Sequence, residues 1–147
     1  MLYNYRIMKK ILVVGSKNTY RSIIVAEFLK KALKDKGNNG VEVKSAGIMA
    51  FPDIPAEPEA VSQLKSLGID GEFKSSPLQK QSVAEADLIL TMSDKIKTAI
   101  SGKFSDKAAV IHAFKSYAGG SGDLEASAGL GDEVKGLVEG SIDKFAG

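Results

Sequence analysis

The order of apolar segments along the chain constrains the fold more than any other feature. Residues 11–14 form a short run, Ile-Leu-Val-Val, that ends at Gly15, and such a run is typical of a buried parallel strand. Within residues 22–36 apolar side chains recur at helical spacing, which predicts a helix that packs on a sheet. A buried strand followed by an amphipathic helix indicates an α/β fold.

The same alternation continues along the rest of the chain. Further strands are predicted at 41–46, 86–92 and 109–114, and further helices at 57–67, from Ser93 or Asp94 to 100, and around 134–145. An alternating order of this kind predicts a parallel sheet with helices on both faces, joined by right-handed crossovers. We therefore expect an α/β three-layer sandwich.

Length and composition indicate one globular domain. The chain has 147 residues, 44% of them hydrophobic and 26% charged, so a single domain over 1–147 is expected. Its mean hydropathy is -0.05, and it contains neither a signal-peptide pattern nor an apolar run long enough to span a membrane. We expect a cytoplasmic protein with no membrane partner. Because Met8 precedes the first strand closely, residues 1–7 are expected to be a loose extension.

Positive charge is concentrated in the first third of the chain. Residues 1–44 contain ten Lys and Arg against three acidic residues, whereas residues 45–147 contain ten against fifteen. A basic segment can steer anions toward a nearby site. The lysines of the first predicted helix, Lys30, Lys31, Lys34 and Lys36, are interpreted as a solvated face, with an acidic partner or nucleic acid as the alternative. No nucleic-acid motif accompanies them, so nucleic acid is not an expected partner.

The turn between the first strand and the first helix is the expected ligand site, because ligands of such folds bind beyond the carboxyl ends of the strands. The candidate phosphate-binding residues are Gly15, Ser16, Lys17, Asn18, Thr19, Tyr20, Arg21 and Ser22. Backbone N–H groups and the helix amino end favour an anion there. Arg21 can bind two phosphate oxygens, Asn18 tolerates a left-handed backbone, and Ser22 can cap the helix. The alternative is a plain capped turn with a solvated arginine.

This turn carries a resemblance to a known family. The stretch ILVVGSKNTYRSIIVAEFLKK at 11–31 is similar to the opening of low-molecular-weight protein tyrosine phosphatases, whose signature is a strand, C-x5-R-S and a helix with Ala-Glu. The similarity continues through VEVKSAG at 41–47, AEPEAVSQLKSLGID at 56–70, EADLILTMSD at 85–94 and AGGSGD at 118–123. The resemblance implies a four-stranded parallel sheet with a phosphate-binding loop after the first strand. The family includes protein arginine phosphatases, and arsenate reductases share its fold.

The residues that carry the family's chemistry are absent at the matching positions. The resemblance places the nucleophilic cysteine at Gly15, but the chain contains no cysteine, and Ser16 lies one position away. A second loop cysteine of many members corresponds to Tyr20. The Asp-Pro general acid would fall near Ala126, where no Asp-Pro occurs. No catalytic residue is therefore expected at the family's positions.

Other positions have a structural and a functional interpretation. The resemblance implies that Phe51 forms one wall of the substrate pocket, whereas the alternative is a loop residue anchored on the core. The segment 74–76 matches a turn that supports the phosphate loop. His112 is expected to be structural, and one histidine without cysteine makes a zinc site improbable. No metal or cofactor is expected.

The leading interpretation is a catalytically inactive relative of these phosphatases. Loss of the thiolate removes the nucleophile, but it also removes a negative charge from the floor of an anion-binding loop. We expect the loop to bind phosphate or another oxyanion, or a phosphorylated protein. The alternative is an enzyme with residual or non-standard phosphomonoester hydrolase activity, using water with Asp123 or Glu125 as acid or base. A third interpretation is a scaffold with a vestigial site.

Overall fold

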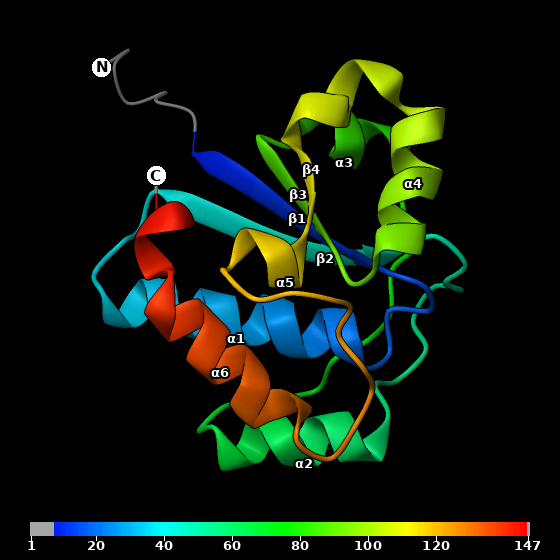
Figure 1. Cartoon of the computed structure of the whole chain (residues 1–147). Coiled ribbons are helices and arrows are strands. Elements are labelled where there is room, and N and C mark those ends of the chain that lie inside the picture. The colour runs from blue at the N-terminus through cyan, green and yellow to red at the C-terminus, as the bar shows by residue number, and fades with distance from the viewer. Residues whose placement is uncertain (1–7, 147) are drawn as a thin grey trace, which may run out of the picture.

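Four parallel strands form the central sheet of the molecule (Figure 1). The computed structural model describes residues 8–146, and its strands are β1 (Lys9–Gly15), β2 (Val41–Gly47), β3 (Leu88–Thr91) and β4 (Ile111–Ala113). They lie in the order β2-β1-β3-β4, and every neighbouring pair is parallel. The predicted α/β fold with a four-stranded parallel sheet is thus confirmed. The loose extension expected at 1–7 lies outside the described residues.

Helices cover both faces of this sheet (Figure 1). Helices α1 (Arg21–Asp35) and α6 (Leu130–Gly140) pack together on one face, and α2 (Pro58–Ser66) packs against both of them. Helices α3 (Lys80–Glu85) and α4 (Asp94–Lys103) lie on the other face. A short helix, α5 (Phe114–Tyr117), follows β4 directly. The layers follow from the connections, because each crossover between parallel strands must pass over a face of the sheet.

Helix α1 is buried on more sides than its apolar stripe predicts. Val25, Phe28 and Leu29 are buried as expected, but Ser22 and Ile24 are buried as well. The reason is that α2 and α6 both pack on this helix in addition to the sheet. The amino end of α1 is therefore enclosed by other parts of the chain at the point where β1 leads into it.

The last strand and the helices around it differ from the sequence prediction. The strand predicted at 109–114 is only three residues long, because Ser105–Val110 form a 3-10 helix and α5 begins at Phe114. Helix α3 was not predicted, since it is short, mostly polar and buries only Val83. Local periodicity is a weak signal for such short elements.

The closing helix also ends earlier than predicted. Helix α6 ends at Gly140, and Ser141 donates a hydrogen bond from Oγ to the main-chain oxygen of Leu137 at 2.6 Å. A separate 3-10 turn, Ile142–Lys144, then brings Phe145 into the core, where its ring lies 6.2 Å from that of Phe114. Val134, Val138, Ile142 and Phe145 are thus buried, but by two elements, and Leu137 is half-buried.

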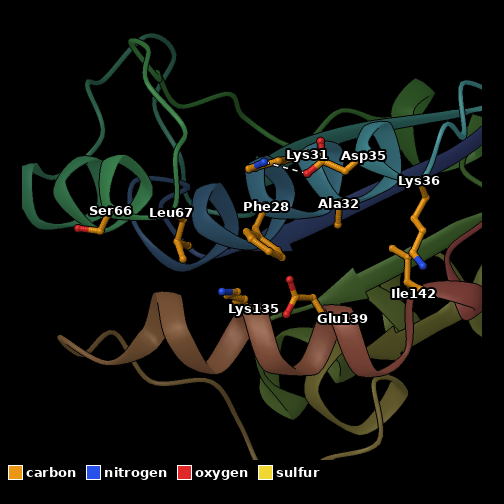
Figure 2. A pocket seen from close by; sticks show the side chains of 10 residues that line it. All are labelled: Phe28, Lys31, Ala32, Asp35, Lys36, Ser66, Leu67, Lys135, Glu139 and Ile142. Atoms are coloured by element: carbon orange, nitrogen blue, oxygen red, sulfur yellow. Dashed lines mark hydrogen bonds and ion pairs between the residues drawn. The ribbon is translucent and has the colours of Figure 1, made fainter.

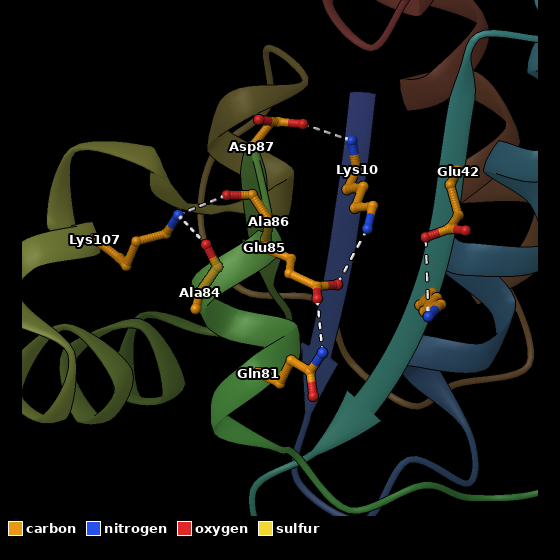
Figure 3. Close-up of polar contacts among 9 residues, drawn as sticks. Lys10, Glu42, Gln81, Ala84, Glu85, Ala86, Asp87 and Lys107 are labelled. Carbon is orange, nitrogen blue, oxygen red and sulfur yellow. Dashed lines mark hydrogen bonds and ion pairs between the residues drawn. The ribbon is translucent and has the colours of Figure 1, made fainter. Parts of the chain in front are cut away.

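A group of polar contacts joins the elements near the amino ends of the strands (Figure 3). The main-chain N–H of Lys10 donates to the carboxylate of Asp87 at 2.8 Å, and Lys10 Nζ lies 3.1 Å from Glu85 Oε1. Hydrogen bonds from Gln81 and Lys10 lower the pKa of Glu85. Lys107 Nζ donates to the main-chain oxygens of residues 84 and 86. The contacts of Lys10 tie the segment between α3 and β3 to β1, and those of Lys107 tie it to the 3-10 helix before β4. They lie at the end of the sheet opposite the expected ligand site.

Candidate functional site

The eight residues predicted to bind an anion line one cavity at the carboxyl end of β1. This cavity has a volume of about 290 Å³. Its lining consists of Gly15, Ser16, Lys17, Asn18, Thr19, Tyr20, Arg21, Ser22, Glu57 and Ala126. We call residues 15–22 the anion loop. The last two lining residues come from distant parts of the chain, one just before α2 and one from residues 118–129, which we call the late loop.

Asn18 holds the anion loop in its shape from inside. Its φ is 59°, the left-handed conformation that a tight loop requires, and its side chain is buried. Nδ2 donates to Ser22 Oγ at 2.8 Å and to Ser45 Oγ at 3.0 Å, and Oδ1 accepts from the main-chain N–H of Ser76 at 2.8 Å. The segment 74–76 therefore supports the loop, as the resemblance implied, but through its backbone.

The same contacts correct the role expected for Ser22 as a helix cap. Helix α1 begins at Arg21, its N-cap position is Tyr20, and no side chain caps it. The Ser22 hydroxyl instead accepts the hydrogen bond from Asn18. The first turn of α1 also contains no acidic residue, so its peptide N–H groups and its helix dipole remain available to an anion in the cavity.

Close contact with the end of β2 fixes the other side of the loop. A β-carbon on Gly47 would overlap the main-chain oxygen of Ser16, so only glycine allows this approach. The main-chain N–H groups of Ile48 and Met49 donate to the oxygens of Gly15 and Ser16 at 3.0 and 2.8 Å. The segment after β2 is thus attached to the first two residues of the anion loop.

The late loop is attached to the anion loop by two neighbouring side chains. Arg21 Nη1 donates to the main-chain oxygen of Leu124 at 3.3 Å. Tyr20 donates from its hydroxyl to the main-chain oxygen of Ser127 at 3.1 Å and accepts from Gln63 Nε2 at 2.9 Å. Burial, followed by the negative charge of Glu59, raises the pKa of Tyr20. The phenol is therefore held in its neutral, hydrogen-bonding form.

Gln63 completes this connection, and the sequence reasoning did not identify it. Its Nε2 also donates to the oxygen of Ser127 at 2.8 Å, and its Oε1 accepts from the main-chain N–H of Gly131 at 2.5 Å. One side chain of α2 thus binds both the late loop and the start of α6. No local sequence signal marks this role, because the partners lie more than sixty positions away.

Glu57 is the second residue that the sequence reasoning missed. Its main-chain N–H donates to the oxygen of Thr19 at 2.9 Å, and its Oε2 accepts from Thr19 Oγ1 at 3.1 Å. The carboxylate is therefore held at the rim of the cavity, beside an otherwise basic loop that contains Lys17 and Arg21. A negative charge in this place favours a ligand that combines an anionic and a cationic group.

The floor of the cavity is backbone at Gly15. A β-carbon there would lie 3.0 Å from Ser22 Oγ and 3.5 Å from Met92 Cγ. The chain contains no cysteine, so no thiolate acts at any position. The Ser22 hydroxyl lies next to the floor, and Ser16 also lines the cavity.

The two late-loop carboxylates that were candidates for acid or base do not line the cavity. Asp123 Oδ1 accepts from the main-chain N–H of Asp94 at 2.9 Å, at the amino end of α4, and Glu125 is exposed. Phe51 does not line this cavity and is 75% exposed, so it is not anchored on the core, and its role as a wall of the substrate pocket stays a prediction. From the late loop only Ala126 reaches the cavity.

A larger cavity, of about 530 Å³, lies between α1, α2 and α6 (Figure 2). Phe28, Leu67 and Ile142 line it together with charged side chains, among which Lys31 and Asp35 form an ion pair at 2.8 Å. It lies at the carboxyl ends of α1 and α2, where the helix dipoles disfavour an anion. The smaller cavity is therefore the better candidate for an anionic ligand.

Metal and membrane features give no second candidate. Within residues 8–146 no three His, Asp or Glu side chains lie close enough together to hold a metal ion. No helix of this described part is long and apolar enough to cross a bilayer. His112 is half-buried in β4, and its ring lies 5.0 Å from that of Tyr117.

Comparisons with known proteins agree on one family. A family model described as low molecular weight phosphotyrosine protein phosphatase matches residues 10–145. The protein-arginine-phosphatase of Bacillus subtilis (strain 168) is 36% identical over 115 residues, which is 78% of this chain and 76% of the relative. That of Geobacillus stearothermophilus is 32% identical over 145 residues, covering 92% and 95%.

A solved structure matches as well. It is the YwlE arginine phosphatase in a cysteine-to-serine mutant with a phosphorylated active site serine. Its TM-score to this chain is 0.84 at 30% sequence identity, with 92% of this chain and 94% of that chain covered.

These findings correct the expectation of a catalytically inactive protein. Relatives that cover most of the chain are named as phosphatases, so the enzyme alternative is better supported than the inactive one. The absence of cysteine excludes a thiolate nucleophile, but the loop, its arginine and the amino end of α1 are present around the cavity. The sequence reasoning gave more weight to the loss of the family's cysteine mechanism than to its own alternative, residual or non-standard phosphatase activity.

Proposed function

We propose that this chain, which belongs to the low molecular weight phosphotyrosine protein phosphatase family, removes phosphoryl groups from protein side chains. The reaction takes place at the cavity lined by the anion loop. One observation carries the proposal. All eight residues of the loop line a single cavity whose electrostatics suit a phosphoryl group, with Arg21, Lys17 and the amino end of α1 around it.

The nucleophile in this proposal is water. We place the attacking water above Gly15, on the side of the cavity floor where the Ser22 hydroxyl lies. Its oxygen forms a bond to phosphorus while the bond from phosphorus to the leaving group breaks. The serine mutant of the arginine phosphatase, with its phosphorylated active site serine, supports the principle that an oxygen atom in this fold accepts a phosphoryl group. Without a thiolate we expect slow turnover.

The favoured substrate is phosphoarginine. Glu57 places a carboxylate at the rim, where it attracts a guanidinium group and repels a second anion. No general acid of the late loop lines the cavity. The guanidinium group of phosphoarginine already carries its own proton, so cleavage of the P–N bond releases a neutral guanidine, which then takes up the proton lost by the attacking water. The products are inorganic phosphate and arginine. A phenolate leaving group from phosphotyrosine gains less from this arrangement.

The test is release of inorganic phosphate from two peptides of the same sequence, one with phosphoarginine and one with phosphotyrosine. The protein should release phosphate from both, faster from phosphoarginine. Arg21→Ala should abolish release, and Glu57→Gln should reduce the preference for phosphoarginine while leaving phosphate binding intact. The proposal would be overturned if the wild-type protein released phosphate no faster than the folded Arg21→Ala variant.

A further inference from the structure

Strand β2 is an edge of the sheet, and its main-chain groups alternate between β1 and the open side. Among the strands it pairs only with β1. On this inner side the oxygen of Gly40 accepts from the N–H of Lys9, and the N–H of Ile48 donates to the oxygen of Gly15. Because main-chain groups of successive residues point to opposite sides of a strand, the even-numbered residues of β2 bond to β1 and the odd-numbered residues face outward.

The chain covers this outward edge only at its carboxyl end. There the N–H of Gly47 donates to the oxygen of Ser76 at 2.9 Å, and the oxygen of Gly47 accepts from the N–H of Leu78 at 3.0 Å. In the part of the chain that the structure describes, the outward main-chain groups of residues 41–45 have no main-chain partner. A cavity of about 460 Å³ opens beside this stretch, between β2, α1 and the segment 72–79. An uncovered edge can pair with a further strand.

Two opposite charges flank the middle of this uncovered stretch. Glu42 and Lys44 lie on either side of Val43 in the sequence Val-Glu-Val-Lys-Ser. Both side chains lie on the face of the sheet that also carries α3, where they share a small cavity with Glu85 (Figure 3). Glu42 is 38% exposed and Lys44 is 63% exposed, so both can meet a partner. Charged side chains usually protect an edge from pairing, but this pattern is complementary to itself when one copy is reversed.

We propose that β2 pairs with β2 of a second copy of this chain, antiparallel and about a twofold axis at Val43. In this arrangement Val43 exchanges its main-chain hydrogen bonds with Val43 of the second copy, and Val41 exchanges its own with Ser45. Glu42 then lies directly opposite Lys44 of the second copy, in the type of pair in which side chains approach most closely. Opposite charges in such cross-strand pairs stabilise the contact. The two sheets join into one, and the twofold axis closes the assembly at two copies.

The charges and the covered end of β2 select this register over its neighbours. With the axis at Glu42, that carboxylate would lie opposite Glu42 of the second copy, and like charges opposite each other destabilise a strand pair. With the axis at Lys44, the two lysines would meet. Val41 would then also need the outward groups of Gly47, which the segment 72–79 already occupies. The axis at Val43 brings opposite charges together in both pairs.

The test is sedimentation velocity of the full chain and four variants from about 10 µM to about 1 mM, because one strand pair gives a small interface and a weak dimer. Glu42→Lys and Lys44→Glu each place like charges opposite each other. The double variant Glu42→Lys/Lys44→Glu has the composition of the wild type and restores both pairs. Lys95→Glu, at an exposed position of α4, is the control for the change in charge. None of these residues lines the anion cavity, so the result does not depend on the proposed function.

The wild type, the double variant and Lys95→Glu should form dimers of similar affinity. Each of the two single variants on β2 should dimerise at least about tenfold more weakly by itself, because both of its charge pairs become repulsive. An equimolar mixture of Glu42→Lys and Lys44→Glu should form a heterodimer, since opposite charges then face each other again. Amide hydrogen exchange at the odd-numbered residues of β2 should slow at high concentration.

A wild-type protein that stays monomeric over the whole range would overturn the proposal, and the edge would then remain open to an extended segment of a different protein. Dimers of wild-type strength in both single variants on β2 would overturn it as well, because a different face would then form the interface. If the wild type dimerised but the mixture of these two variants did not, the register at Val43 would be wrong.

Discussion

Arg21 donates a hydrogen bond from Nη1 to the main-chain oxygen of Leu124, 3.3 Å away, although 103 positions separate the two residues. The side chain of Leu124 is fully buried, and its main-chain N–H donates to the oxygen of Met92 at 3.2 Å. The oxygen that orients the guanidinium is therefore fixed by the core. Arg21 is held at the cavity before a ligand arrives, which reduces the ordering cost of binding an anion.

Arg21→Ala should weaken phosphate binding by about ten- to a hundredfold, because hydrogen bonds to charged groups contribute about 1.5–3 kcal/mol. An NMR titration with phosphate measures this through the backbone amides of residues 16–22. Saturable shifts should appear in the wild type and be lost in the variant. Lys30→Ala, on the exposed face of α1, is the control and should behave as wild type. Equal shifts in wild type and Arg21→Ala would contradict the prediction.

Gly15→Cys should increase hydrolysis of p-nitrophenyl phosphate by at least about tenfold, because it places a thiol at the floor of the cavity beside the amino end of α1. The new β-carbon would lie 3.0 Å from Ser22 Oγ, so that hydroxyl must move by a few tenths of an ångström. This substrate suits the test because its leaving group needs little protonation. Gly102→Cys, where a β-carbon meets nothing within 4 Å, controls for the presence of a thiol. A folded Gly15→Cys protein with unchanged activity would count against the assignment of the floor.

Gly47→Ala should destabilise the fold by about 1–3 kcal/mol, the usual cost of forcing extra atoms into a packed place. The added methyl group would overlap the main-chain oxygen of Ser16 and lie 3.0 Å from the main-chain nitrogen of Asn18, both on the anion loop. Urea unfolding measures the loss of free energy of unfolding. Gly40→Ala is the matched control, because its nearest neighbour would be a side-chain atom 3.8 Å away. Equal stability of the two variants would show that the loop yields easily.

Tyr20→Phe should make stability less sensitive to alkaline pH. Burial and the charge of Glu59 raise the pKa of Tyr20, so the folded state holds the phenol proton more tightly than the unfolded state does. Where the folded state binds more protons, the free energy of unfolding falls as pH rises. The stability that this raised pKa contributes is fully present below the pKa of tyrosine in the unfolded state, about 10. It is lost as pH rises through the higher pKa of Tyr20 in the folded state.

Urea unfolding of wild type and Tyr20→Phe at a series of pH values from about 8 to 11 measures the difference. The wild type should lose stability more steeply in the upper part of this range. Gln63 keeps its hydrogen bond to the oxygen of Ser127 in the variant, so the late loop retains one attachment. If the free energy of unfolding changed with pH in the same way in both proteins, the raised pKa of Tyr20 would be contradicted.

Much of the fold was predictable because its main elements have strong local patterns. The apolar run at 11–14 and the helical periodicity of 22–36 correspond to β1 and α1. Weak local patterns led to errors. Helix α3 buries one side chain, and β4 has three residues, so neither has a period long enough to be recognised.

The sequence by itself determined the α/β alternation, the place of the anion loop after β1 and the absence of a thiol, because these depend on residue type and short-range spacing. Only the tertiary structure decided which distant side chains join that loop. Glu57, Gln63 and Leu124 reach it from other parts of the chain. It also decided that Asp123 binds the amino end of α4 and that Phe51 lies exposed. The physical reason is that such contacts form between segments brought together by packing of the whole core, and no local pattern encodes them.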